Sequence, residues 1–254
     1  MNLLLFDREE RQGKRLFLTG RRAEHIQKVL RLQPGDQLRL GEVNGFMGTG
    51  VIRKITDTGV ELKVELTTAP RPEPDITLIL ALPRPIMLKR ILKQATTLGV
   101  KEFHLIRTRR VEKSFYHSPV LKAENIRDIL LQALEQAMDT RLPQVHIHKQ
   151  FKPFVQDILP SLPGTRLLAH PGESASLFDL LAPHRQSGPE KTKDGSGTSV
   201  LLAVGPEGGF VDYECEQFAA QRFSTFTMGS RILHVDTAVV ALLAQVQLLL
   251  DASF

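Results

Sequence analysis

The first quarter of the chain alternates apolar and polar residues over short distances, a pattern that predicts half-buried β-strands. Turn-forming residues separate these segments at Pro34-Gly35-Asp36, Asn44-Gly45 and Asp57-Thr58-Gly59. One stretch, Arg22–Leu30, has helical spacing instead. We therefore expect a compact β-barrel over Leu16–Leu66, with one helical interruption. Its strands are expected at Gln37–Leu40, Gly48–Ile55 and Gly59–Leu66.

Beyond residue 75 the pattern changes, and apolar runs of strand length alternate with amphipathic segments of helix length. This alternation is typical of a parallel sheet covered by helices. The best-marked helix is Pro85–Leu98, which Gly99 closes. Strands are expected at Ile76–Leu82, Val100–Ile106, Val145–His148, Arg166–Ala169, Ser199–Val204 and Phe223–Met228. Further helices are expected at Leu121–Asp139, Phe151–Leu159, Tyr213–Gln221 and Thr237–Leu250.

A proline-rich segment separates the two patterns. Ala69–Asp75 holds three prolines in seven residues, so it should be extended and free of regular structure. We place a domain boundary there, which gives one domain over residues 1–70 and another over residues 71–254. Within the second domain, Arg185–Thr198 is rich in Gly, Ser and Lys and is interpreted as a solvated loop.

Composition narrows the possible classes of protein. The chain has 254 residues, of which 42% are hydrophobic and 24% charged, enough to bury a full core and to exclude a disordered chain. Neither a membrane-spanning apolar run nor a signal-peptide start is present, which predicts a cytoplasmic location. The single cysteine, Cys215, excludes an intramolecular disulfide and fits a reducing compartment. A net charge of +5 favours polyanionic partners.

The sharpest local signal is an apolar strand that ends in a glycine-rich turn before a helix, Leu201–Phe210. Glycines at 205, 208 and 209 permit positive φ and let a ligand approach free backbone N–H groups. The turn lacks the pattern of a phosphate-binding P-loop, and its late position and spacing do not suit a dinucleotide fold. A second such turn, Met228–Ala238, follows a later strand. Two such turns on nearby strand ends predict one pocket at the carboxyl edge of the sheet.

These two turns, Val204–Phe210 and Met228–Ala238, resemble the sequence motif with which a SPOUT-class family binds S-adenosyl-L-methionine (SAM). That family methylates uridine N3 in small-subunit (16S) ribosomal RNA. The likeness covers nearly the whole chain. Leu18–Arg31 with Pro34–Asp36 resembles the family's PUA-like N-terminal domain, Lys93–Val100 its first catalytic-domain helix, and Glu135–Pro143 the end of its long helix.

The resemblance implies an α/β fold: an N-terminal PUA-like β-barrel that binds RNA and a C-terminal SPOUT α/β domain with a trefoil knot. It also implies a homodimer; the apolar residues on several faces of Thr237–Leu250 fit a dimer contact and a monomer core equally well. The implied cofactor is S-adenosyl-L-methionine, and the implied partner is ribosomal RNA or the small ribosomal subunit, with no membrane and no metal ion. The residues expected to hold the cofactor are His170, Leu202, Gly205, Glu207, Gly208, Gly209, Met228, Gly229, Ile232 and Leu233.

Methylation of uridine N3 requires a group that removes or shares the N3 proton. Glu207, Asp236 and His234 are the candidates for this role, and Arg231 is the candidate for stabilising negative charge on the uracil oxygens. The chain departs from the family pattern at three places. His234 replaces a usual Arg by a titratable group, Asp236 replaces a usual Glu but keeps the carboxylate, and Thr97 stands where an acidic residue is usual.

RNA contacts are expected from basic residues of both domains. Arg107–Arg110 follows a strand, so these cations should lie at a sheet end where phosphates can bind. Aromatic residues make up 6% of the chain with no Trp, so extensive base stacking is not the expected mode. Two other functions stay open: a SPOUT methyltransferase acting on another nucleotide or on transfer RNA, and a non-catalytic RNA-binding or ribosome-assembly protein. The RNA-binding candidates are Arg21, Arg22, Lys28, Arg31, Arg107, Arg109, Arg110 and Lys113.

Overall fold

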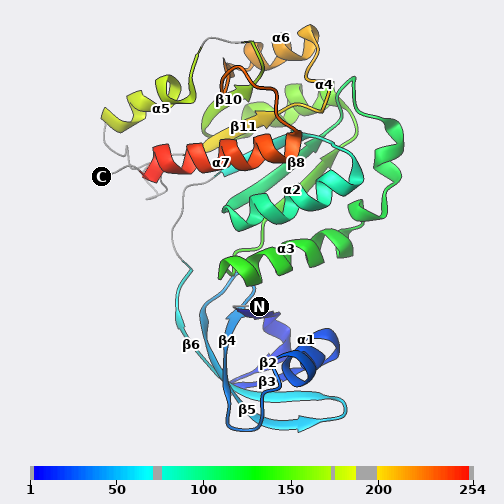
Figure 1. The fold of residues 1–254 in the computed structure, drawn as a ribbon, viewed down its shortest axis with the longest axis vertical. Coiled ribbons are helices and arrows are strands. Elements are labelled where there is room, and N and C mark those ends of the chain that lie inside the picture. The colour runs from blue at the N-terminus through cyan, green and yellow to red at the C-terminus, as the bar shows by residue number, and fades with distance from the viewer. Residues whose placement is uncertain (1–2, 71–75, 173–174, 187–198, 252–254) are drawn as a thin grey trace. The chain divides into compact units, whose positions relative to one another are not determined.

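The computed structural model describes residues 3–70, 76–172, 175–186 and 199–251, and its chain forms two compact units (Figure 1). Unit 1 comprises Met1–Pro72 and Leu131–Leu142, and unit 2 comprises Glu73–Leu130 and Pro143–Phe254. In the described ranges, no helix is both long enough and apolar enough to cross a membrane. Most of the expected loop at Arg185–Thr198 lies outside the described residues. Its first two residues belong to a helix, so the prediction that the loop begins at Arg185 is wrong.

Unit 1 is built on a six-stranded sheet with the strand order β1-β4-β5-β6-β3-β2. β1 pairs with β4 in parallel, and the other neighbouring strands are antiparallel. The expected helix at Arg22–Leu30 is α1 (Gly20–Glu24), which continues as a π-helical turn, η2 (His25–Val29). A short 3-10 turn, η1, spans Arg8–Glu10. The strands are β1 (Leu4–Phe6), β2 (Arg11–Gln12), β3 (Arg15–Leu18), β4 (Gln37–Glu42), β5 (Met47–Thr56) and β6 (Gly59–Thr68).

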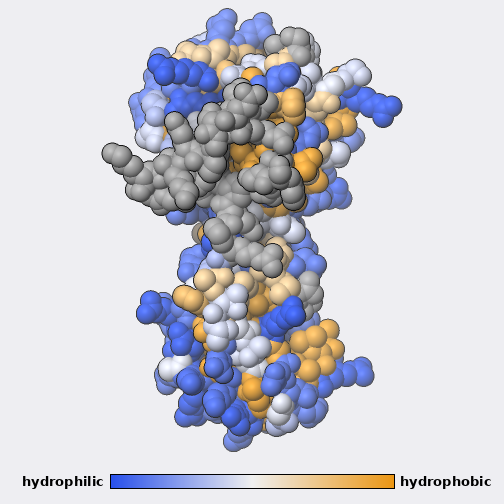
Figure 2. Space-filling model, turned by 90° about the vertical axis from the view of Figure 1, so that its left-hand side faces the viewer, coloured by the Kyte–Doolittle hydropathy of each residue, from blue (hydrophilic) through white to orange (hydrophobic). Residues whose placement is uncertain are grey.

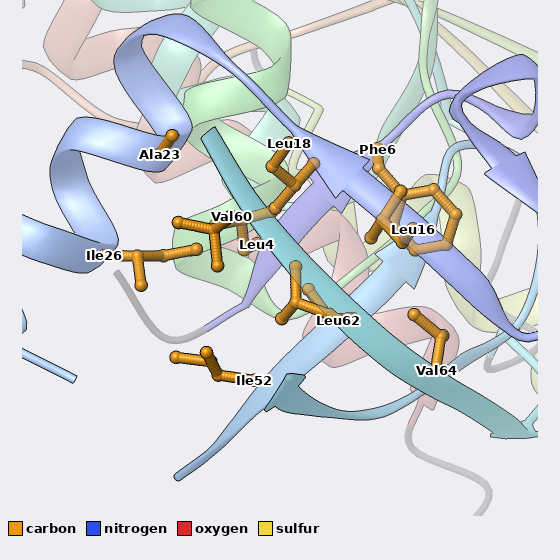
Figure 3. Close-up of a cluster of buried hydrophobic side chains, with 11 residues drawn as sticks. Leu4, Phe6, Leu16, Leu18, Ala23, Ile26, Ile52, Val60, Leu62 and Val64 are labelled. Atoms are coloured by element: carbon orange, nitrogen blue, oxygen red, sulfur yellow. The ribbon is translucent and has the colours of Figure 1, made fainter. Parts of the chain in front are cut away.

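The core of unit 1 follows from the alternation in its strands. Val60, Leu62 and Val64 of β6 are buried at every second position, so they share one face of the sheet. Ala23 of α1 and Ile26 of η2 point toward the same cluster of side chains (Figure 3). The helical interruption therefore covers an apolar sheet face that would otherwise be exposed to solvent.

Unit 2 contains a six-stranded sheet in which every neighbouring pair is parallel, with the order β12-β10-β11-β7-β8-β9. The central strand β11 is buried at all five positions, as expected for a parallel strand covered on both faces. The expected mixed α/β fold class, with a sheet-built first unit and a parallel-sheet second unit, is confirmed, whereas the trefoil knot stays a prediction. The strands are β7 (Ile76–Ala81), β8 (Val100–Ile106), β9 (Gln144–His148), β10 (Thr165–Ala169), β11 (Val200–Val204) and β12 (Ser224–Phe226).

Helices cover this sheet, and α2 and α7 lie side by side (Figure 1). The Gln247 side chain of α7 donates a hydrogen bond to the Leu98 carbonyl at the end of α2. The helices of unit 2 are α2 (Pro85–Thr97), α4 (Phe151–Pro153), α5 (Leu177–Gln186), α6 (Asp212–Ala220) and α7 (Val235–Asp251). One further helix, α3 (Ala123–Ala137), begins in unit 2, and its residues from Leu131 onward belong to unit 1. Shorter helical turns are η3 (Lys113–His117), η4 (Pro119–Leu121), η5 (Phe154–Ile158) and η6 (Leu159–Ser161).

Most of the surface seen in Figure 2 is hydrophilic, and hydrophobic residues show there in smaller patches. Several large apolar side chains are exposed in unit 2 all the same. Ile86 of α2 is 66% exposed and Leu248 of α7 is 64% exposed. Exposed apolar side chains on adjacent helices are a common feature of protein contact surfaces.

A cluster of three histidines joins β8 to β9. The His104 ring packs against the rings of both His146 and His148, and its Nδ1 lies 2.9 Å from His148 Nε2. Glu102 Oε1 lies 3.1 Å from His104 Nε2 and 3.0 Å from His146 Nε2. Burial lowers the pKa of His104 to about 4, with a smaller contribution from His146. Burial, followed by the neighbouring histidines, also lowers the pKa of His148 to about 4.

This cluster makes stability depend on pH. Because folding depresses the pKa of His104 from 6.5 to about 4, the unfolded chain binds more protons between these values, so stability falls as pH falls from 6.5 to 4. We expect His104 alone to account for about 2 kcal/mol of this loss, after allowance for solvent screening. Urea unfolding between pH 7 and pH 4 measures it. His104→Gln should flatten the dependence, whereas the exposed His117→Gln should not; equal slopes in all three proteins would contradict the assignment.

Candidate active site

Three loops of unit 2 meet at the carboxyl edge of the sheet. The strands β12, β10 and β11 are parallel neighbours in that order, so their carboxyl ends lie together. The turn after β11, the turn after β10 and the turn after β12 line one pocket. The residues of this pocket that the sequence singled out are His170, Gly205, Glu207, Gly209, Met228, Gly229, Arg231, Ile232 and Leu233.

Glycines shape the backbone around the pocket. Gly209 has φ of 75°, and Gly229 has φ of 117°, both in the left-handed region that side chains disfavour. The Gly209 N–H donates to the Pro206 carbonyl at 2.8 Å, which closes the tight turn after β11. Around Gly229, no described atom lies within 4 Å of the position that a Cβ would take. The backbone therefore borders the pocket without side chains in the way.

The pocket combines an apolar wall with a few polar groups. Met228 and Leu233 belong to the wall, and Ile232 is 87% exposed at its mouth. Glu207 and Arg231 are exposed members of the lining. The His170 backbone N–H donates to the Phe226 carbonyl at 3.0 Å, a bond that ties the loop after β10 to the end of β12. This composition suits an organic ligand with both apolar and charged parts.

Four of the expected site residues do not line this pocket. Leu202 is fully buried within β11, and Gly208 lies under the Arg110 side chain. Asp236 makes an ion pair of 3.7 Å with Arg90 of α2, and its Oδ1 accepts a hydrogen bond from the Thr237 N–H. His234 is exposed at the start of α7, where its carbonyl accepts the Ala238 N–H. Of the candidate proton acceptors, only Glu207 shares the pocket lining with Arg231.

A buried carboxylate that the sequence analysis missed holds the basic loop after β8. Glu214 is 3% exposed; its Oε1 accepts the Arg109 N–H at 2.7 Å and its Oε2 accepts the Val211 N–H at 3.0 Å. Arg110 also donates to the Gly208 carbonyl. The loop after β8 is therefore attached to the glycine-rich turn through Arg110 and to the start of α6 through Glu214. The available signal was an acidic residue in the first turn of a helix, where it can reach back to free N–H groups.

The candidate RNA-binding residues of unit 1 differ in whether their side chains are bonded within the unit or exposed to solvent. Arg22 is bonded to Glu10 at 2.8 Å and to the Leu5 carbonyl at 3.1 Å, so its guanidinium is held inside the unit. Arg21 is 58% exposed and lies 4.0 Å from the Glu135 carboxylate. Lys28 pairs with Glu24 on the helix surface at 3.6 Å, and Arg31 is exposed. Arg21, Lys28 and Arg31 are thus the cations of this group that unit 1 presents to solvent.

An open parallel α/β sheet, with a glycine-lined pocket at the carboxyl ends of neighbouring strands, defines a ligand-binding enzyme domain. Residues 70–247 match the family model of an RNA methyltransferase domain, and residues 18–65 match that of an RNA methyltransferase PUA domain. The chain belongs to this RNA methyltransferase family. The family resemblance read from the two glycine-bearing turns is thereby confirmed.

Known proteins resemble the chain over almost all its length. The ribosomal RNA small subunit methyltransferase E of Treponema pallidum is 29% identical over 251 residues, which are 97% of this chain and 90% of that protein. The enzyme named ribosomal RNA small subunit methyltransferase E 1 of Borreliella burgdorferi is 25% identical over 250 residues, 95% of each chain.

Solved structures share the fold. The ribosomal RNA small subunit methyltransferase E from Neisseria gonorrhoeae, bound to S-adenosyl methionine, has a TM-score of 0.77 at 22% identity, covering 97% of this chain and 98% of that one. A methyltransferase from Legionella pneumophila in complex with SAM has a TM-score of 0.78 at 22% identity, covering 97% and 96% of the two chains.

Proposed function

We propose that this protein transfers a methyl group from SAM to uridine N3 in small-subunit ribosomal RNA. The observation that carries the proposal is the shared pocket: the glycine-bearing turns after β11 and β12, which α6 and β12 separate in sequence, line one cavity with the loop after β10. Relatives that match nearly the whole chain are named as methyltransferases of small-subunit ribosomal RNA, which supports the substrate class.

The lining fits SAM. Gly209 and Gly229 have no side chains, so the adenosine part can approach the main chain closely at these two positions. The apolar side chains of Met228, Ile232 and Leu233 suit the adenine ring and the carbon chain of the ligand. When bound, SAM supplies a methyl group activated by the adjoining sulfonium. Leu202 and Gly208 do not line the pocket, and in this proposal their role is to fix the conformation of the turn after β11.

In this proposal, two pocket residues act on the uracil: one removes its N3 proton, and the other stabilises the negative charge that results. Glu207 is placed to accept the N3 proton, because it is the candidate carboxylate within the lining. Arg231 stabilises the negative charge that spreads to the uracil oxygens once that proton leaves. Asp236 is held by Arg90, so its proposed role is to position the start of α7 rather than to take the proton.

The proposed domains in chain order are residues 1–70 and 71–254, although Leu131–Leu142 cluster with unit 1. Unit 1 serves as an RNA-binding domain in this proposal. Its match to an RNA methyltransferase PUA domain and its exposed cations Arg21, Lys28 and Arg31 support this role. We further propose a homodimer, supported by the exposed Ile86 and Leu248 on adjacent helices. We also propose a cytoplasmic location, which a ribosomal substrate supports, and a chemistry that uses no metal ion.

The test combines binding with product analysis. Calorimetry with SAM should show binding, and incubation with small-subunit RNA or subunits should yield N3-methyluridine on mass spectrometry of the digested RNA. Ribosomal RNA from cells lacking the protein should miss one methyluridine. A different methylated nucleoside would overturn the uridine N3 assignment, and the absence of both SAM binding and methyl transfer would overturn the enzymatic function.

A further inference from the structure

Beside the pocket, unit 2 carries a second concave surface with its own chemistry. This groove has a volume of about 810 Å³ and is bordered by the loop after β8, the loop after β9 and the start of α6. Phe210 lines the pocket and the next residue, Val211, lines the groove, so the two sites adjoin. We propose that this groove binds single-stranded RNA next to the target nucleotide, with one base stacked on Tyr213. The inference rests on the proposed function.

The charge of the groove favours a polyanion. Four cations border it, Arg107 and Arg109 and Lys113 from the loop after β8 and Lys149 from the loop after β9, against two carboxylates, Asp212 and Glu214. The carboxylate of Glu214 is buried and already accepts two backbone N–H groups, so it offers little repulsion to a phosphate. The groove therefore keeps an excess of positive charge where an RNA backbone would pass.

The aromatic residues favour an unpaired strand. Tyr213 is 49% exposed at the start of α6, although burial of its ring would be favourable. Its ring contacts Phe151 edge-on, with centroids 6.5 Å apart, which steadies the tyrosine and leaves ring surface open. An exposed aromatic ring beside cations is the usual platform for an unstacked base, whereas paired bases in a duplex are not accessible to it.

The structure also links the groove to the SAM pocket. Glu214, directly after Tyr213, holds the Arg109 backbone, and Arg110 holds the Gly208 carbonyl of the glycine-rich turn. The cations of the groove and the turn that borders the pocket are thus fixed to each other through short contacts. A strand bound in the groove would therefore lie next to the turn that borders the pocket.

The test measures binding of a labelled single-stranded oligouridylate to the full-length protein by fluorescence anisotropy. Tyr213→Ala should weaken binding roughly tenfold, because the surface on which one base stacks is lost. Tyr213→Phe should keep the affinity, since the ring remains. Lys149→Ala should lower the slope of log affinity against log salt by about 0.7, the value for one phosphate contact on a single strand. SAM affinity should be unchanged in all three variants.

Matched controls are Phe178→Ala, which removes an exposed aromatic ring from α5, and Lys122→Ala, which removes an exposed lysine. Both should bind like the wild type. The proposal that RNA binds in this groove would be overturned if Tyr213→Ala kept its affinity and Lys149→Ala kept its salt slope. It would also be overturned if Tyr213→Ala weakened the binding of duplex RNA equally. If methyl transfer persists without single-strand binding, the proposed RNA-binding role of the groove is refuted and the proposed function stands. If the single strand binds but no methyl group is transferred, the proposed function is refuted and the groove stands as an RNA-binding site.

Discussion

Replacing Gly209 by valine is expected to weaken SAM binding by tenfold or more while the protein still unfolds cooperatively. Gly209 has φ of 75°, and a β-branched residue in that region costs about 1–3 kcal/mol. A Cβ there would meet only Arg110 Nη1, at 3.7 Å, so the strain lies in the backbone rather than in a clash. The turn can relieve it only by shifting the backbone that borders the pocket. Isothermal calorimetry and thermal unfolding measure the two effects separately.

A matched control exists in unit 1. Gly35 has φ of 101°, and no described atom lies within 4 Å of the place where its Cβ would stand, so Gly35→Val imposes similar backbone strain away from the pocket. It should lower the melting temperature as Gly209→Val does and leave SAM affinity unchanged. Gly208→Ala should be milder than Gly209→Val, because its Cβ would meet the flexible Arg110 side chain, 2.9 Å away. Full SAM affinity in Gly209→Val would remove this turn from the binding site.

Periodicity predicted the longer elements whose burial is one-sided or complete, and missed those that are very short or that contain a residue which normally ends the element. The strands of the parallel sheet and helices α2, α3, α6 and α7 were predicted to within a few residues. α5 was not, because it includes Pro183, which normally ends a helix. β1 has only three residues, all buried, and its pairing with β4 is a long-range contact. The expected helix at Phe151–Leu159 became α4, η5 and η6, since Pro153 and Pro160 interrupt the N–H series.

The site could be predicted at the level of loops but not of side chains. The rule that ligands bind at the carboxyl ends of parallel strands placed both glycine-bearing turns at one edge, because they follow β11 and β12. Whether a side chain faces the pocket depends on which residues it contacts in the folded chain, and the spacing of residues in the sequence does not reveal those contacts. Arg90 forms an ion pair with Asp236 across more than half of the chain, and Glu10 forms one with Arg22, 12 residues away in sequence. Both partners became visible only in the folded structure.

Arg231 offers a test of the chemistry itself. It lies in the turn after β12, lines the pocket with Glu207, and is exposed to an entering ligand. If it stabilises a uracil that has lost its N3 proton, it lowers the pKa of that proton in the complex. Removing Arg231 should then slow the reaction more at neutral pH than at alkaline pH, where the uracil loses its N3 proton more readily.

Arg231→Ala is expected to lower the single-turnover rate of methyl transfer by about 100- to 1000-fold, the effect of losing one donor to a developing oxyanion. The variant's rate should keep rising with pH beyond the point where the wild type levels off, because its bound uridine deprotonates at higher pH. Arg231→Lys should fall between the two, since it keeps the charge but not the planar donor pair. Arg222→Ala, an exposed arginine outside the pocket, should react like the wild type. Weakened RNA affinity with an unchanged rate at saturation would instead make Arg231 a binding residue.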